Sequence, residues 1–494
     1  MRKKDMKLNF SSQKKKRRYS DSFIKVSRVS KRFKLFLLVI VFAFITGITT
    51  YIIANEKQNN DTFPKKSEEH QREDSIIEQG QKQFIIGPYG INGDFVEELN
   101  EIEEEETADV WMNGFIETRI PTKVKGIYVT ASKANSTIDD LISLVDETEL
   151  NTMVIDVKDD EGRITFLMDD QMAKEIKATK AYISDIDGLI KKLKEKNIYL
   201  IARVVAFKDP LLAKEKPELA LKKKDGTLFL DKDGLAWVNP YKKEVWDYLV
   251  GVATQCAEVG FDEVNFDYIR FSTDSSMKQV DFGEEALNKT KIETITEFVK
   301  YACTKLRAKK IFVSADVYGA IINSSVDAKI VGQSYLEMSR YLDYICPMIY
   351  PSHYGNGSYG IDYPDTQPYE LILGALGSSK NVLKGISEGE HKAVVRPWLQ
   401  DFTASWLKHY IKYGGKEVRE QIEAVYDSGY EEWLLWNGAM NYTQEALMTE
   451  AEAQKAMKNR ELQNETTETI EEEVIPSKPP NIEQFITSPW KVDN

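Results

Sequence analysis

Two aspartates near the ends of apolar runs are the strongest candidates for catalysis in this sequence. Asp267 lies in VNFDYIRF and Asp316 lies in IFVSADVYG. Cleavage of a glycosidic bond needs two carboxyl groups, one kept protonated and one ionised. The nearby cations Arg270 and Lys158 suit Asp267 to the ionised role, as nucleophile or base. Asp316 has fewer cations close in sequence, so we expect it to be the acid.

Further acids and aromatic residues follow the neighbouring runs. Asp159 and Asp401 are the next candidates for the second carboxylate, behind Asp316. Aromatic rings are more often core residues than sugar platforms, but their place beside acids favours a binding role. We predict a substrate-binding set that shares this placement: Tyr268, Arg270, Lys158, Asp156, Arg203, Tyr350, His353, Arg396, Trp398, Gln400, Trp436 and Asn437.

Three members of this set have alternative roles that the sequence leaves open. Arg270 would orient an acid or bind a sugar hydroxyl, or else form a salt bridge to an acid near its strand end. His353 would contact sugar or cap the loop after its run. Lys158 could hold Asp156 or Asp267 ionised rather than touch substrate.

Other reaction classes fit the sequence poorly. Metal hydrolases on barrels need clustered histidines, whereas only His353 among the four histidines follows a predicted strand. The sequence shows no convincing Ser-His-Asp order and no glycine-rich nucleotide loop. We therefore expect neither a metal nor a cofactor.

Eight apolar runs must position these candidates. Their length and nearly continuous apolar character are typical of strands covered on both faces. Helical patterns separate the runs, so the order strand then helix occurs eight times and predicts an α/β fold, a (β/α)8 TIM barrel. The rival, a doubly wound open sheet, would usually have a glycine-rich turn after its first strand, where YVTASKANST has no glycine. The runs are 125–131, 152–162, 199–207, 264–271, 311–319, 343–354, 394–402 and 432–442.

The polar residues within the runs fall on one parity. Alternate residues of a strand face opposite ways, so one set should line the barrel. That set includes Asp156, Lys158, Arg203, Asn265, Asp267, Asp316, Tyr350, Arg396, Trp398, Gln400 and Asn437. Because barrel interiors are normally filled by branched apolar residues, we expect these side chains to converge on the C-terminal mouth. The alternative for some of them is a structural ion network, with Arg203 and Arg396 holding Asp156 and Asp316.

The composition suits one large core with appendages. The chain has 494 residues, of which 42% are apolar and 11% aromatic. Its three cysteines, Cys256, Cys303 and Cys346, lie at apolar positions of predicted helices or strands. An odd number at such positions predicts buried free thiols, without a disulfide framework or zinc site.

The N-terminal segment predicts a location at the cell membrane. Residues 35–54 contain no charge and have the length that spans a bilayer. Residues 1–34 carry a charge balance of +12, so they should stay cytoplasmic and leave the barrel extracellular. A cleaved signal peptide is the alternative, but the basic segment is long for one and no A-x-A site follows. We expect an uncleaved single-pass transmembrane helix.

The remaining appendages are polar. Residues 55–120 form an acidic linker that includes EELNEIEEEE, and residues 458–494 form a disordered tail, with the barrel at 121–457. The net charge of −13 becomes about −25 once the basic N-terminal segment is excluded. Such an acidic exported part argues against nucleic acid or an anionic polymer backbone as the partner.

The order of eight motifs resembles a known family. KGIYVTA, IDVKDDEG, ARVVAFKDP, W-x-NPY, FDEVNFDYIRF, PMIYPSHY, RPWLQDF and WLLWNG are similar to the glycoside hydrolase domain of bacterial membrane-anchored or secreted proteins, over about residues 123–445. The resemblance implies a TIM barrel distantly similar to α-amylase-like barrels. It implies a catalytic acid at the end of the fourth strand, which is Asp267 here. Amylase-like barrels carry a glutamate after the fifth strand, where this chain has Asp316.

Together these features predict an extracellular, membrane-anchored glycoside hydrolase. Its expected substrate is a cell-surface or environmental polysaccharide, cleaved by a pair of carboxylates. The alternative from another class is a catalytically silent barrel that binds cell-wall glycan or scaffolds an envelope complex.

Overall fold

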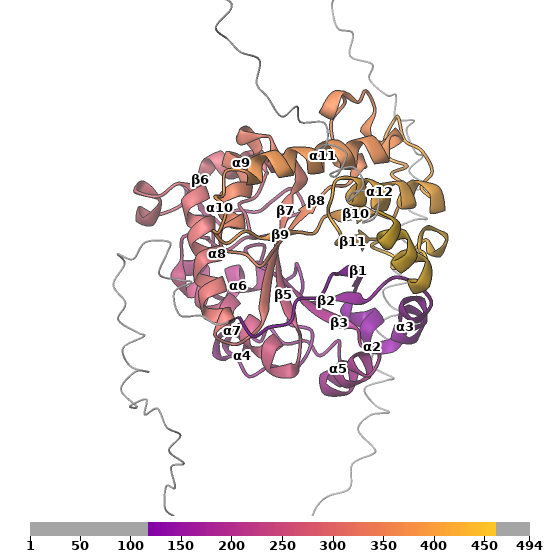
Figure 1. Cartoon of the computed structure of the whole chain (residues 1–494). Helices are drawn as coiled ribbons and strands as arrows, with labels where there is room; N and C mark the ends of the chain where they lie inside the picture. Colours follow the sequence, from indigo (N-terminus) through magenta and orange to yellow (C-terminus); the bar gives the residue numbers. More distant parts are fainter. Residues whose placement is uncertain (1–116, 461–494) are drawn as a thin grey trace, which may run out of the picture. The chain divides into compact units, whose positions relative to one another are not determined.

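The eight apolar runs form the eight strands of a closed parallel barrel in the computed structural model, which describes residues 117–460 (Figure 1). Each strand pairs with the next, and the pairing of β10 with β8 closes the ring. The seventh strand has two parts, because Pro397 separates β9 from β10. The predicted (β/α)8 barrel is therefore confirmed, and the open-sheet rival is wrong. The strands are β1 (Lys125–Val129), β2 (Thr152–Lys158), β3 (Tyr199–Val205), β5 (Glu263–Asp267), β7 (Phe312–Tyr318), β8 (Tyr344–Met348), β9 (Val394–Val395), β10 (Trp398–Gln400) and β11 (Trp433–Trp436).

Helices surround the barrel, and a small antiparallel pair, β4 (Lys222–Lys223) and β6 (Val280–Asp281), joins two of its loops. The longest helices place apolar faces against the strands; Phe298 of α8, for example, packs edge-to-face on Phe266 of β5. The α-helices are α2 (Ala131–Ser136), α3 (Ile138–Glu147), α4 (Gln171–Glu175), α5 (Ile186–Lys194), α6 (Pro210–Glu215), α7 (Lys243–Val259), α8 (Lys291–Arg307), α9 (Ser325–Val331), α10 (Tyr335–Ser339), α11 (Pro368–Leu383) and α12 (Gly415–Asp427). Single 3-10 turns include η6 (Gly319–Ile322) after β7 and η7 (Pro351–His353) after β8.

The two faces of the strands differ as the parity predicts. Residues such as Val264, Phe266 and Val313 belong to the large apolar cluster between barrel and helices. A second, smaller cluster fills the barrel interior and includes Tyr128 and Trp398. The interior also contains buried charges, which need partners there because water cannot solvate them.

Lys158 is the exception to this parity. The register of β2 against β3 shifts between Asp156 and Lys158. The fully buried Lys158 donates to the Val205 carbonyl at 2.7 Å and pairs with Asp209 at 2.8 Å, with its ammonium over the ring of Tyr248 in α7. The expectation that Lys158 lies in the barrel mouth is wrong, because a bulge shifts the alternation of side chains by one residue.

Arg396 lies in a lower layer of the interior. Its guanidinium pairs with Glu263 and Glu432, both at 2.8 Å, and stacks over the ring of Tyr344 at 3.8 Å. Both acids lie at the amino-terminal ends of their strands. Arg396 therefore sits below the mouth and does not hold Asp316, so its expected place in the mouth is wrong.

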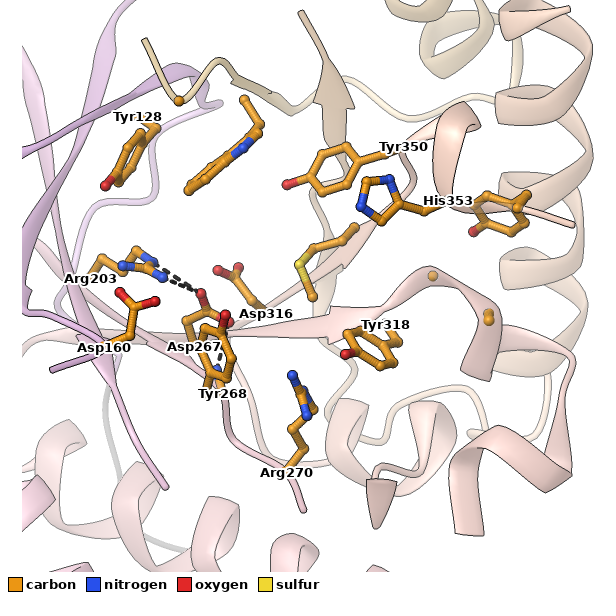
Figure 2. A pocket seen from close by; sticks show the side chains of 16 residues that line it. Tyr128, Asp160, Arg203, Asp267, Tyr268, Arg270, Asp316, Tyr318, Tyr350 and His353 are labelled. Atoms are coloured by element: carbon orange, nitrogen blue, oxygen red, sulfur yellow. Dashed lines mark hydrogen bonds and ion pairs between the residues drawn. The ribbon is translucent and has the colours of Figure 1, made fainter. Parts of the chain in front are cut away.

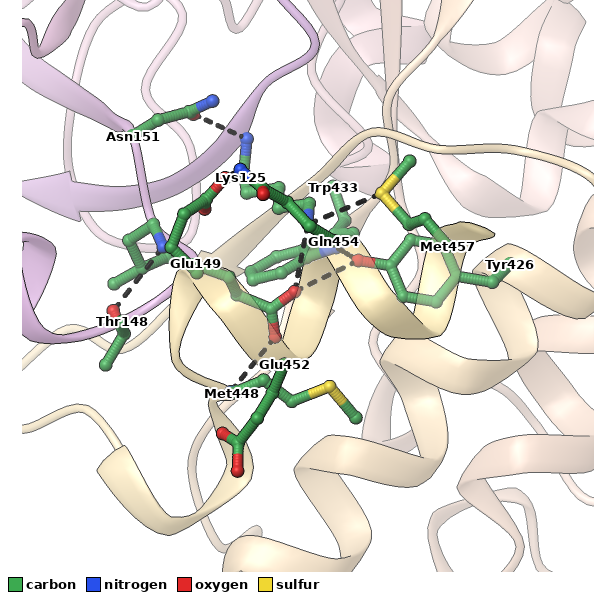
Figure 3. A network of polar contacts seen from close by, with 12 residues as sticks. Lys125, Thr148, Glu149, Asn151, Tyr426, Trp433, Met448, Glu452, Gln454 and Met457 are labelled. Carbon is green, nitrogen blue, oxygen red and sulfur yellow. Dashed lines mark hydrogen bonds and ion pairs between the residues drawn. The ribbon is translucent and has the colours of Figure 1, made fainter. Parts of the chain in front are cut away.

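A polar network lies at the amino-terminal ends of the strands, at the end of the barrel away from the mouth (Figure 3). The buried Glu149 accepts hydrogen bonds from Lys125 at 3.0 Å, from Arg419 at 2.6 Å and from the Met448 amide at 3.2 Å. Burial opposes ionisation of Glu149, but Arg419 and Lys125 hold its pKa below the ordinary value. The network joins β1 to α12 and to the segment after β11.

The predicted appendages lie almost wholly outside the described residues. These are the basic segment 1–34, the transmembrane helix 35–54, the linker up to residue 116 and the tail from 461. Within residues 117–460, no helix combines the length and apolar character that crossing a bilayer requires. Arg119, at the end of the predicted linker, pairs with Asp343 at 2.8 Å.

Candidate active site

A cavity of about 580 Å³ opens at the carboxyl ends of the barrel strands (Figure 2). Its lining includes the last residues of β5, β7, β8 and β11, which are Asp267, Tyr318, Met348 and Trp436. This is the end at which barrel enzymes carry their chemistry. Eight predicted residues line the cavity: Asp267, Asp316, Arg203, Tyr268, Arg270, Tyr350, His353 and Trp436.

Arg203 of β3 ties two carboxylates together beneath the cavity. Its Nε and Nη2 donate to Asp267 Oδ2 at 3.0 and 2.5 Å, and its Nη1 donates to Asp156 Oδ1 at 2.7 Å. The Tyr128 hydroxyl donates to the other oxygen of Asp156. Two bonds from one guanidinium stabilise the charged form of Asp267 in a nearly dry site.

The peptide after Asp267 is strained. Tyr268 has φ of 50°, a left-handed conformation that is unfavourable for a side-chain-bearing residue. Its amide donates to Asp267 Oδ1 at 2.6 Å, so both oxygens of Asp267 have a donor. The strain and the ion pair together fix this carboxylate at the cavity wall.

Asp316 of β7 has a different environment. It is 3% exposed, and no cation lies within ion-pair distance of it among the described residues. Its Oδ1 accepts from Trp398 Nε1 at 2.7 Å and from Asn265 Nδ2 at 2.9 Å. Burial and then the charge of Asp267 raise the pKa of Asp316 to about 8, against these two hydrogen bonds. Asp316 is therefore protonated at neutral pH while it faces the same cavity as Asp267.

Aromatic side chains form much of the cavity wall. Tyr128 and Trp436 stack with their ring centres 4.3 Å apart, and Tyr350 packs edge-to-face on His353. Burial lowers the pKa of His353, which favours a neutral imidazole at neutral pH. The wall therefore combines aromatic rings with a few placed polar and charged groups, a combination typical of small-ligand sites.

A family model described as "Putative glycosyl hydrolase domain" matches residues 126–442. The chain belongs to this family. The match agrees with the motif resemblance, and the glycoside hydrolase class predicted from the sequence is confirmed at the level of the family. No curated protein is significantly similar to this sequence.

Several solved structures resemble parts of the chain. A hypothetical protein from Ruminiclostridium thermocellum is 37% identical with a TM-score of 0.36, over 39% of this chain and 97% of its own. The glycoside hydrolase domain of PgaB from Bordetella bronchiseptica is 12% identical with a TM-score of 0.48, over 66% of this chain and 98% of its own. An α-L-fucosidase from Paenibacillus thiaminolyticus is 12% identical with a TM-score of 0.44, over 69% of this chain and 50% of its own.

The other predicted residues of this glycosyl hydrolase domain lie away from the cavity surface. Asp159 accepts the amides of Glu161 and Arg163 and so shapes the turn after β2. Asp401 is buried and binds the hydroxyl and amide of Thr443. Neither acid lines the cavity beside Asp267, because Asp159 accepts two backbone amides of its own turn and Asp401 accepts both donors of Thr443.

Four polar residues support the cavity from behind. Asp156 holds Arg203, and Trp398 holds Asp316, as described above. Gln400 donates to Asp365 at 3.0 Å and accepts from the Ser352 amide at 3.0 Å. Asn437 donates to the Asp401 carbonyl at 2.6 Å. The expectation that these four contact substrate does not fit their burial, because their polar groups face neighbouring strands and loops.

Several lining residues were not in the predicted set: Tyr128, Asp160, Tyr318, Met348 and Tyr354. Asp160 is the most informative of these, since it is a third carboxylate at the cavity and pairs with Lys208 at 3.4 Å. It adjoins Asp159 in the sequence, and only the turn geometry decides which of the two faces the cavity. Strand parity places Tyr128 in the inward-facing set, although it is not among the predicted binding residues. Among the described residues, no group of three or more His, Cys, Asp or Glu has the geometry of a metal site.

We predict that Asp316→Asn raises the free energy of unfolding at pH 7. In the wild type the unfolded carboxyl ionises near 3.8, whereas the folded one stays protonated until about 8. Between these values ionisation favours the unfolded chain, so the wild type loses stability as pH rises, and asparagine avoids that loss. We expect a gain of about 1–3 kcal/mol at pH 7 that shrinks toward pH 4, measured by urea unfolding.

The exposed Asp362 supplies the matched control, because Asp362→Asn should change stability little at any pH. An Asp316→Asn protein that is less stable than the wild type at pH 7, or a difference that does not vary with pH, would contradict a protonated Asp316.

Proposed function

We propose that this chain cleaves glycosidic bonds with Asp267 and Asp316 as its catalytic pair. The observation that supports this most is the contrast between two acids at one cavity. Asp267 is paired with the Arg203 guanidinium, whereas burial and the charge of Asp267 raise the pKa of Asp316. Glycoside hydrolysis requires that difference between its two carboxyl groups.

In this scheme Asp316 donates its proton to the glycosidic oxygen as the bond to the anomeric carbon breaks. Asp267 acts on that carbon directly as nucleophile, or it removes a proton from the water that attacks it. Water supplies the hydroxyl group of the new sugar end. Its remaining proton returns to Asp316 directly in a retaining reaction, or by way of Asp267 in an inverting one. Trp398 and Asn265 hold the acid in place, and the rings of Tyr350 and Trp436 provide faces for sugar.

The substrate and place of action are a further part of the proposal. The apolar segment 35–54, the basic segment before it and the acidic linker after it suit a barrel held outside the cell by one helix. An exported barrel of this kind would act on a polysaccharide of the cell surface or the surroundings.

We predict that Asp267→Asn and Asp316→Asn each lower turnover by about 10³-fold or more, because each removes one half of the acid–base pair. The measurement is release of reducing ends from a panel of cell-wall and α- or β-linked glucans by the full chain. Asp362→Asn should retain wild-type activity. Near-normal turnover of Asp267→Asn would remove it from the mechanism. If the wild type binds glycans across the panel and cleaves none, the glycan-binding barrel becomes the better account.

For topology, we predict that protease added to intact protoplasts removes the barrel and spares residues 1–34. The positive charge before the apolar segment favours retention of that side in the cytoplasm. A barrel that stays protected until the membrane is opened would contradict an extracellular location.

A further inference from the structure

Arg270 is a buried cation at the cavity wall without an acidic partner among the described residues. Its side chain is 8% exposed, and it lines the cavity three residues after Asp267. Its Nη1 donates to the Phe271 carbonyl at 3.0 Å. The salt bridge that the sequence left open as an alternative is not formed in residues 117–460.

Three aromatic rings surround the Arg270 guanidinium. It lies 4.6 Å from the ring centre of Tyr318, 4.9 Å from Tyr268 and 5.2 Å from Trp237. Figure 2 shows its guanidinium end pointing toward the cavity between Tyr268 and Tyr318. Rings stabilise a cation through their faces, but they accept none of its in-plane hydrogen bonds. The three rings therefore hold the guanidinium in place and leave some of its N–H donors free for an acceptor in the cavity.

The neighbouring buried cations show what is missing at Arg270. Each of four other buried cations forms an ion pair with at least one carboxylate. The pairs are Arg203 with Asp156 and Asp267, Arg396 with Glu263 and Glu432, Lys158 with Asp209, and Lys208 with Asp160. A buried charge without such a partner costs folding free energy. A cavity with such an unpaired buried cation at its wall is suited to bind an anionic ligand.

We propose that Arg270 binds the carboxylate of an acidic sugar, so that the preferred substrate is a glycan with uronic-acid-type residues beside the bond that is cleaved. A planar guanidinium matches a planar carboxylate through paired hydrogen bonds. Arg270 and Asp267 come from one strand end, which places the acidic sugar next to the catalytic pair. The assignment rests on the proposed function, since it names the substrate class of the same cavity.

The overall acidity of the exported part limits which acidic glycan fits. Long-range repulsion of a polymer charged at every sugar is reduced, but not removed, by physiological salt, which screens charges over about 8 Å. A contact inside the cavity is screened much less. A glycan that carries a carboxylate on only some of its sugars meets less of this repulsion.

The test compares oligosaccharides that differ only in the acidic group. A panel of uronate-containing hexasaccharides, their carboxyl-reduced forms and their sulfated reduced forms is titrated by calorimetry into Asp267→Asn protein, so that binding is separated from cleavage. We expect at least one carboxylated member to bind about 10- to 100-fold more tightly than its reduced form, as charge-assisted hydrogen bonds imply. Stronger binding of the sulfated form, or no preference for any carboxylated member, overturns the proposal.

Two variants in the same background locate the contact. Arg270→Gln should abolish the preference, whereas Arg340→Gln removes a cation that lies outside the cavity lining and already pairs with Glu337 and Glu390, and should preserve it. Circular dichroism checks that each variant is folded; if Arg270→Gln is not, Arg270→Lys should retain part of the preference. Loss of the preference in Arg340→Gln, or its persistence in Arg270→Gln, overturns the role of Arg270.

Failure of this proposal and failure of the proposed function give different results. A wild type that cleaves neutral and acidic glycans equally retains the function and loses the acidic specificity. If the wild type cleaves nothing but binds acidic glycans in a way that depends on Arg270, the proposed function fails and the proposed binding site stands.

Discussion

The ion pair between Arg203 and Asp267 is the interaction on which the candidate site depends. The guanidinium donates two hydrogen bonds to a carboxylate that is largely buried in the barrel mouth, where a charge needs partners from the protein. The charge of Asp267 then acts on Asp316, where burial already disfavours ionisation. The two acids therefore share one cavity but differ in their surroundings: Asp267 pairs with a guanidinium, whereas burial and the charge of Asp267 raise the pKa of Asp316.

The rest of the barrel supports this arrangement. Its interior carries two charged layers, Arg203 with Asp156 and Asp267 near the mouth and Arg396 with Glu263 and Glu432 below. The lower layer and the Glu149 network stabilise the strands at the end where no chemistry is expected, which leaves the mouth free to hold strained or unpaired groups. Tyr268, which has a positive φ, is such a strained residue, and Arg270, which lies among aromatic rings, is such an unpaired charge.

The sequence was enough to predict the fold and the parity of the barrel strands, because period-two alternation and apolar runs are local properties. It was not enough to choose partners for the buried charges. The sequence predicts Arg396 in the barrel mouth, but the relative register of the strands places it beside Glu263 instead. The predicted positions of Lys158 and Asp159 are wrong for a related reason. A bulge in β2 and the turn after it reverse the direction of neighbouring side chains, and period-two alternation predicts neither feature.

The measurement that tests the central claim most directly is a crystal structure of the Asp267→Asn protein soaked with oligosaccharides that the wild type cleaves or binds. The account predicts a sugar chain across the mouth, with one glycosidic oxygen about 3 Å from a carboxyl oxygen of Asp316 and the adjoining anomeric carbon facing residue 267. A chain bound elsewhere, or bound at the mouth with no glycosidic oxygen within hydrogen-bond reach of Asp316, would contradict it.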